Sequence, residues 1–214
     1  MPLLSLSLSE AFREPAECVI KVGPDQICVE ECYPFLQEVL IECDRSQAAV
    51  AKIQFETIRD TDGKWQIQDA GIFEPWAPVV IEAAFGSRTE EIIRGYIREV
   101  QAEYPQDRHA VVTVMVQDES IRMDREHICR AWGEENPVTD QVILQEIAGK
   151  YGLDLDPECG VGQDGVIANQ DETDIVFLRK RAKANGYELI VREGTIYFGP
   201  MRLTAQSQAR IMVY

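Results

Sequence analysis

Residues 171–198 read DETDIVFLRKRAKANGYELIVREGTIYF and contain the clearest structural pattern in the chain. A helix is predicted over Glu172–Asn185, with Asp171 as its cap, acids in its first turn and basic residues in its last two turns. Its apolar stripe consists of Ile175, Leu178 and Ala182. After Gly186, two β-like runs separated by Arg192–Gly194 predict a tight hairpin. The stretch therefore predicts a compact helix–strand–strand unit in which the helix covers one hairpin face.

A similar pattern lies just upstream. Thr139–Tyr151 is predicted to form a helix, with Thr139 as its cap and Gly152 as a left-handed stop. The basic cluster Arg179–Lys183 is expected to be a solvated helix end, with an acidic patch on a neighbouring subunit as the alternative.

The first part of the chain is rich in short β-like runs. These runs are Cys18–Val22, Gln26–Val29, Ala51–Ile58, Trp65–Gln68, Val79–Phe85, Glu91–Val100 and Ala110–Gln117. The Asp-Gly pair in Asp60–Lys64 predicts a hairpin that joins the third run to the fourth. Leu36–Ile41 fits a strand or a helix, and Gly95 indicates a bulge or a close backbone approach. So many strands at short intervals predict an antiparallel barrel or sandwich, and a barrel is the form expected here.

The predicted fold class is therefore α+β. Residues 1–122 are expected to form the barrel domain, and residues 123–200 a small α/β region of two helices and a β-hairpin. Residues 201–214 are expected to begin a possible second barrel that is incomplete in this chain.

Composition excludes several classes of protein. The 214 residues carry a formal net charge of −16, which disfavours binding driven by a nucleic-acid backbone or by an anionic membrane. The first nine residues make a poor signal peptide, and no apolar run is long enough to span a bilayer. A soluble product made in the cytoplasm is expected. The six cysteines are expected to be reduced, buried thiols, with a disulfide among the first four as the alternative.

Two motifs resemble ligand-binding loops only in part. Gly160–Gly165 satisfies G-x-G-x-x-G, but β-like Val166–Ile167 follows it where a phosphate loop requires a helix. The second motif is made of Asp154, Asp156 and Glu158. Its spacing fits the first ligands of a calcium loop, yet the Gly and the bidentate Glu required later in that loop are missing. A loop of permissive glycines and solvated carboxylates is expected here.

No residue is assigned a catalytic, cofactor-binding or metal-binding role. His109 and His127 have no adjacent Ser or Cys and are expected to be partly exposed strand residues. No zinc motif of familiar spacing is present. A Glu/Asp pair of the glycosidase type remains open because 37 acids always offer some pair at a workable distance. The tryptophans Trp65, Trp76 and Trp132 are expected to be core or interface anchors, with ligand platforms as the alternative.

The order of several segments resembles the phage late control protein D family, the baseplate hub proteins of contractile tails. The resemblance rests on Asn169–Leu178, Arg181–Ala182, Gly186–Tyr187, Gly194–Phe198, Arg130–Gly133, Val142–Ala148, Tyr151–Leu153, Ile92–Ile97, Glu103–Pro105 and Gln117–Asp118. It covers residues 78–200 well, and residues 1–77 only by strand pattern. It implies a barrel like that of a tail tube, followed by an inserted α/β region and then by a second barrel. Because the sequence ends at Tyr214, three explanations stay open: a truncated chain, a barrel on another polypeptide, or a shortened hub.

The resemblance also implies a function. It predicts a structural hub that joins the tail tube to the central spike in a phage tail or contractile injection apparatus, and no enzyme. The implied partners are copies of itself in a ring (a trimer or pseudo-hexamer), the tail tube protein and the central spike protein. Neither a membrane span nor sequence-specific nucleic-acid binding is expected. The alternative is a peptidoglycan-degrading tail hydrolase that uses a Glu/Asp pair.

Overall fold

A computed structural model describes residues 17–44, 47–85, 88–104 and 109–202. The first nine residues lie outside these ranges, as do residues 203–214 of the segment expected to begin a second barrel. None of the helices in the described ranges is long and apolar enough to cross a membrane.

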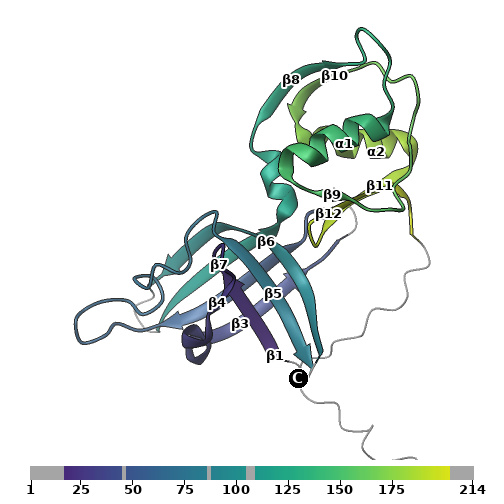
Figure 1. The fold of residues 1–214 in the computed structure, drawn as a ribbon. Coiled ribbons are helices and arrows are strands. Elements are labelled where there is room, and N and C mark those ends of the chain that lie inside the picture. The colour runs from purple at the N-terminus through teal and green to yellow at the C-terminus, as the bar shows by residue number, and fades with distance from the viewer. Residues whose placement is uncertain (1–16, 45–46, 86–87, 105–108, 203–214) are drawn as a thin grey trace, which may run out of the picture.

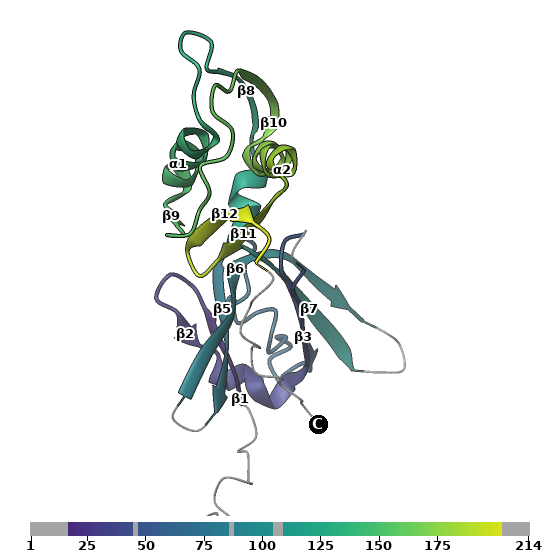
Figure 2. The same ribbon diagram turned by 90° about the vertical axis from the view of Figure 1, so that its right-hand side faces the viewer.

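The first part of the chain folds into one antiparallel sheet of seven strands in the order β2-β1-β5-β6-β7-β4-β3. The strands are β1 (Glu17–Val22), β2 (Ile27–Cys28), β3 (Leu36–Glu42), β4 (Val50–Thr57), β5 (Pro78–Phe85), β6 (Arg88–Glu103) and β7 (Ala110–Asp118). The sheet curls strongly, as Figures 1 and 2 show. Among the described strands no pairing joins β2 to β3, so the structure shows a half-barrel where a closed barrel was predicted.

The core of the half-barrel follows from strand alternation. In β4 and in β7 every second side chain is buried, including Ile53, Phe55, Val112 and Val114. Successive side chains of a strand point to opposite faces, so these residues line the inside of the curl and their neighbours face outward. The short 3-10 helix η2 (Glu30–Phe35) adds the buried Cys32 to the same core.

For the half-barrel, the structure decides one prediction that was left open and shows that another is wrong. Leu36–Ile41, which fitted a strand or a helix, lies in strand β3. The run Trp65–Gln68 is not a strand: Trp65 forms an isolated bridge with Arg59, and residues 66–70 are turns. The Asp60 turn itself is present, because the Asp60 carboxylate accepts hydrogen bonds from the N–H groups of Asp62 and Lys64. Strand β4 already pairs with β3 on one side and with β7 on the other, so it has no free edge with which Trp65–Gln68 could pair.

Gly95 lies at a close approach between strands, which was one of the two expectations for it. A Cβ at this position would lie 1.9 Å from the carbonyl oxygen of Gln117 on β7. Register shifts occur nearby, and both place the extra residue on β6: Ile92 opposite Ile81 and Glu82 of β5, and Arg98 between Ile97 and Glu99.

The second part of the chain lies beyond one end of the half-barrel (Figure 1) and packs around its own apolar core. Its elements are η3 (Glu119–Asp124), β8 (His127–Trp132), α1 (Asp140–Tyr151), β9 (Asp154–Leu155), β10 (Ala168–Thr173), α2 (Asp174–Asn185), β11 (Tyr187–Arg192) and β12 (Thr195–Pro200). Strands β8 and β10 form an antiparallel ribbon, and β11, β12 and β9 form a three-stranded sheet. The predicted division at residue 122 falls inside η3, and the domain limits remain a prediction.

Helix α1 and the final hairpin confirm the sequence prediction. The Thr139 side chain accepts a hydrogen bond from the Val142 N–H at 3.2 Å, and Gly152 adopts a left-handed conformation. The β11–β12 turn consists of Glu193 and Gly194, both with positive φ, as a tight two-residue hairpin turn requires.

Helix α2 begins two residues later than predicted. Asp171, expected as its cap, lies in β10 opposite Cys129 of β8, and Glu172 and Thr173 continue that pairing. Thr173 occupies the cap position without a side-chain cap, and its hydroxyl donates to the Asp124 carboxylate at 2.8 Å.

Candidate functional site

The two edge strands of the half-barrel are its most evident docking features. Among the described residues, strand β3 pairs with β4 alone, and β2 pairs with β1 alone. Each edge carries a large exposed apolar side chain: Leu40 on β3 is 46% exposed and Ile27 on β2 is 66% exposed. An unpaired edge presents free backbone donors and acceptors that another chain can pair with.

The tryptophans have three different environments. Trp132 is buried in the second core, where it stacks on Phe177 and donates its indole N–H to Gln170. Trp76 is partly exposed, with the Arg125 guanidinium 4.3 Å from its ring centroid. Trp65 lies against the exposed ring of Tyr104. Trp132 is therefore a core anchor, and Trp76 has the exposure of an interface residue.

A small hollow lies beside strands β5 and β6 of the half-barrel, where Glu119 of η3 reaches its rim. Its lining includes Arg94, Tyr96 and Glu119, and its volume is about 80 Å³. Pockets for small molecules measure on the order of 300–1,000 Å³, so this hollow is too small for a sugar. Burial raises the pKa of Glu119, and the Gly194 N–H holds its carboxylate in place.

The basic cluster of α2 is used within the chain, which corrects the expectation of a wholly solvated helix end. Arg181 forms an ion pair with the buried Asp140, at 2.6 Å from Nε to Oδ1. Burial by itself would raise the pKa of Asp140. Hydrogen bonds from Arg181, Asn185 and the Gln163 N–H outweigh that effect and lower it. Lys180 pairs with Glu172, while Arg179 and Lys183 are exposed.

A second buried carboxylate, Asp174, joins α2 to α1 and to the β-ribbon. It accepts hydrogen bonds from Tyr151 and Gln170, both at 2.7 Å, and from Lys150 at 3.0 Å. Burial alone would raise the pKa of Asp174, but these three donors lower it. Like Asp140, this carboxylate is enclosed by its donors and is a structural group.

The glycine motif is a packing loop. A Cβ at Gly160 would meet the Tyr187 ring at 2.8 Å, and one at Gly162 would meet Asp140 at 2.5 Å. The loop runs against the start of α1, where the N–H groups of Asp140 and Gln141 donate to its carbonyls. Because these donors are already used, the helix N-terminus does not offer a phosphate site.

The three acids with calcium-like spacing do not converge on a cation site. Arg202 lies between two of them, 2.7 Å from Asp156 and 2.9 Å from Glu158. Asp154 lies in β9 and is exposed. The Arg202 guanidinium therefore occupies the place between the two carboxylates that a bound cation would need.

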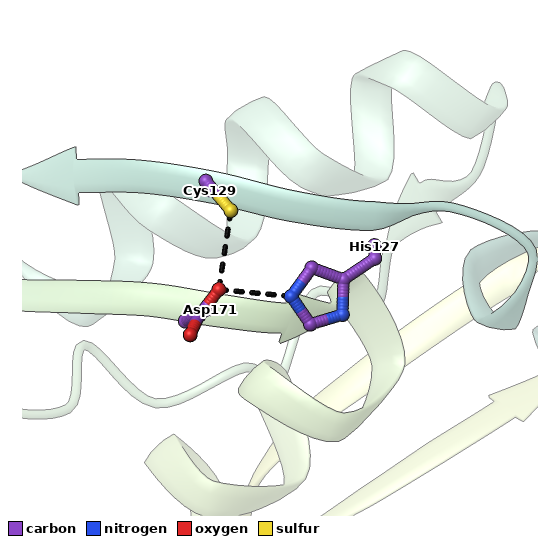
Figure 3. Close-up of side chains that lie close together, drawn as sticks. All are labelled: His127, Cys129 and Asp171. Carbon is purple, nitrogen blue, oxygen red and sulfur yellow. Dashed lines mark hydrogen bonds and ion pairs between the residues drawn. The ribbon is translucent and has the colours of Figure 1, made fainter.

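Both histidines are exposed, as expected, and each faces a carboxylate; His127 lies in strand β8 as predicted, whereas His109 lies just before β7. His109 pairs with Glu56. His127 Nε2 lies 2.9 Å from Asp171 Oδ1, and Cys129 Sγ donates to the same oxygen at 3.1 Å (Figure 3). Hydrogen bonds from His127 and then Cys129 lower the pKa of Asp171, and the bond to Asp171 raises the pKa of Cys129.

Sequence reasoning missed this cluster. The sequence signal for it is the spacing of His127 and Cys129, two residues apart in a strand, which places both side chains on one face.

All six cysteines are free thiols, but only Cys32 is buried, so the expectation of burial was wrong for the other five.

Comparison with known proteins identifies the fold. A family model described as Alg8 N-terminal domain matches residues 20–213. No curated protein matches the chain. The 43 kDa tail protein of prophage MuSo2 from Shewanella oneidensis is similar in structure, with a TM-score of 0.65 and 18% identity over 85% of this chain and 52% of that one. The tail protein from Neisseria meningitidis MC58 has a TM-score of 0.60 and 11% identity over 90% of this chain and 52% of that one.

These likenesses bear on the resemblance found in the sequence. The chain has the fold of phage tail proteins and spans about half the length of the two it matches. The matching family model is not one named for a hub. The phage-tail-like fold is thus confirmed, and the specific hub family is not.

Proposed function

This chain belongs to the Alg8 N-terminal domain family and has the fold of phage tail proteins, and from these two facts we propose that it is a structural hub protein. In this proposal it joins the tail tube to the central spike of a phage tail or contractile injection apparatus. It is made in the cytoplasm and then built into the baseplate.

The observation that carries the proposal is the open half-barrel, whose edges at β2 and β3 pair with no other strand in the described part of the chain. A chain with two different free edges can join copies head to tail, and such contacts close into a ring when the rotation between copies is right. We infer a ring of this kind, a trimer or pseudo-hexamer, with the tail tube protein and the spike protein on its two sides. The exposed Leu40 and Ile27 would be covered at the contacts between subunits.

The proposed role is not enzymatic. Asp140 and Asp174, the least exposed carboxylates in the described part of the chain, have lowered pKa values because donors from their own chain favour the ionised form. A glycosidase needs one carboxyl kept protonated beside the scissile bond and a second one across a cleft that admits the sugar. Glu119 has a raised pKa, but the hollow that it lines has a volume of about 80 Å³. The geometry therefore supports a building component better than the alternative hydrolase.

Light scattering tests this proposal. The chain is measured alone and mixed with the tube and spike proteins of the same apparatus. A hub gives a defined oligomer and a heavier complex with at least one of these partners. A monomer that joins neither partner, or sustained turnover of purified cell walls that is lost on Glu119→Gln, would overturn it.

A further inference from the structure

Three side chains with different donor atoms meet on the solvent face of the β8–β10 ribbon. His127 and Cys129 are two residues apart in β8, so they point to the same side. Asp171 is the direct cross-strand partner of Cys129 and therefore shares that side. The nitrogen, sulfur and oxygen atoms all lie within 4.8 Å of one another, and all three residues are exposed (Figure 3).

We propose that His127, Cys129 and Asp171 form a binding site for a divalent transition metal, with Zn²⁺ as its best-matched ion. This site is independent of the proposed hub function. An imidazole nitrogen, a thiolate and a carboxylate oxygen are the three ligand types that Zn²⁺ takes in proteins. Ca²⁺ and Mg²⁺ prefer oxygen ligands alone, so the sulfur and nitrogen donors select against them.

The distances suit such an ion after a small adjustment. Tetrahedral zinc with ordinary bond lengths holds its ligand atoms roughly 3.4–3.6 Å apart. Here the His127 nitrogen lies 2.9 Å and the Cys129 sulfur 3.1 Å from the same Asp171 oxygen. In these two pairs the atoms need to separate by about half an ångström, and the nitrogen and the sulfur start within 4.8 Å of each other. Side-chain rotation supplies such movements without a change in the strands.

The ribbon provides a fixed base for the three ligands. On its opposite face the indole of Trp132 donates to Gln170 at 2.9 Å, and both residues are buried. Six consecutive residue pairs hold the two strands in register, from Ala168 opposite Trp132 to Thr173 opposite His127. Strand-borne ligands on a packed base are spaced more accurately than ligands on loops.

The site is open to solvent, so the fourth coordination position is available to water in the isolated chain. The side chains of His127 and Asp171 are 61% and 81% exposed. Binding releases the thiol proton of Cys129 to solvent and needs a neutral His127 imidazole that carries its one ring proton on Nδ1, so that Nε2 is free to ligate. Metal–ligand bonds then replace the two hydrogen bonds to Asp171. The net charge of −16 favours the approach of a cation.

Titration of the purified, reduced full chain with Zn²⁺ in a calorimeter tests the site. We expect one ion per chain. The dissociation constant should rise about 100-fold in Cys129→Ser and in Asp171→Asn, because even the loss of a residue that only supports a ligand weakens metal binding by about 10- to 100-fold. Cys43→Ser and His109→Gln, exposed residues away from the cluster, are the matched controls and should bind as the original chain does.

Co²⁺ provides a second readout, because a thiolate ligand gives the bound ion an intense near-ultraviolet charge-transfer band. The band should be present in the original chain and in Cys43→Ser, and absent in Cys129→Ser. The absence of one-to-one binding in the original chain would overturn the proposal. Binding that survives unchanged in both Cys129→Ser and Asp171→Asn would also overturn it, because the ion would then lie elsewhere.

Discussion

Glu119 accepts a hydrogen bond from the backbone N–H of Gly194 at 2.7 Å, across 75 residues of sequence. This contact ties η3, which directly follows the half-barrel, to the turn of the β11–β12 hairpin. Burial raises the pKa of Glu119, while the Gly194 N–H acts in the opposite direction. The bond thus ties the first residue of the α/β part, directly after the last half-barrel strand, to the final hairpin of the same part.

Removing this acceptor should loosen the hairpin turn. In Glu119→Ala we expect the Gly194 amide to exchange its hydrogen at least tenfold faster, since its partner is lost. Glu119→Gln keeps a side-chain oxygen in place and should retain most of the protection. Hydrogen exchange followed by mass spectrometry measures the difference. Equal exchange in all three proteins would show that the bond does not hold the turn.

Gly95 should tolerate no side chain, because its Cβ would fall 1.9 Å from the Gln117 carbonyl oxygen of the paired strand. We expect Gly95→Ala to lower the free energy of unfolding by about 3 kcal/mol, the upper range for overpacking. The matched control is Gly149→Ala in α1, where nothing lies within 4 Å of the added atom. That variant should be more stable by roughly 0.5–1 kcal/mol. Urea unfolding gives both values, and a Gly95→Ala protein as stable as the original would contradict the strand register.

Arg181 should be required to keep Asp140 buried. Arg181→Met leaves that carboxylate without its guanidinium, and breaking a buried pair from one side costs about 3–5 kcal/mol. Lys183→Met, an exposed position on the same helix, should change stability by no more than about 0.5 kcal/mol. Thermal and urea unfolding compare the two variants. If both variants lost a similar amount of unfolding free energy, the loss would come from removing any positive charge at the end of α2 and not from breaking the Arg181–Asp140 pair.

Asp174 should make the fold sensitive to acid. Its pKa lies below the ordinary value of 3.8 in the folded chain, so its contribution is present above that value. The contribution is lost as the pH falls through the lowered pKa. Asp174→Asn should cost about 2 kcal/mol at neutral pH, because the amide cannot accept from all three donors.

The gap in unfolding free energy between Asp174→Asn and the original chain should narrow as the pH falls below about 3.8. Asp62→Asn, on the exposed turn after β4, is the control and should leave stability unchanged within about 0.5 kcal/mol. A gap that stays constant down to strongly acidic pH would mean that Asp174 is not ionised in the folded chain.

Local signals made part of this structure predictable from sequence. Thr139 and Gly152 mark both ends of α1, and the turn at Glu193 and Gly194 marks the final hairpin. Capping residues and positive-φ turns act within a few residues, so the sequence displays them directly.

Pairings between distant segments explain what the sequence did not show. The pairing of β8 with β10 places Asp171 opposite Cys129 and moves the start of α2 to Asp174. The same pairing creates the His127–Asp171 contact across 44 residues. Closure of the sheet likewise depends on whether its end strands meet, which alternation of apolar residues within a single strand does not determine.

The most direct test of the hub account is the light-scattering mass of Leu40→Asp, alone and with the tube and spike proteins. An Asp at this exposed position of β3 lies between Glu38 and Glu42 on the same outer face, and would place three acids at the edge. Val176→Asp, at an exposed apolar position on α2, is the matched control. The account predicts a defined oligomer and a partner complex for the original chain and for Val176→Asp, and loss of the oligomer in Leu40→Asp. A monomeric original chain that joins neither partner would contradict it.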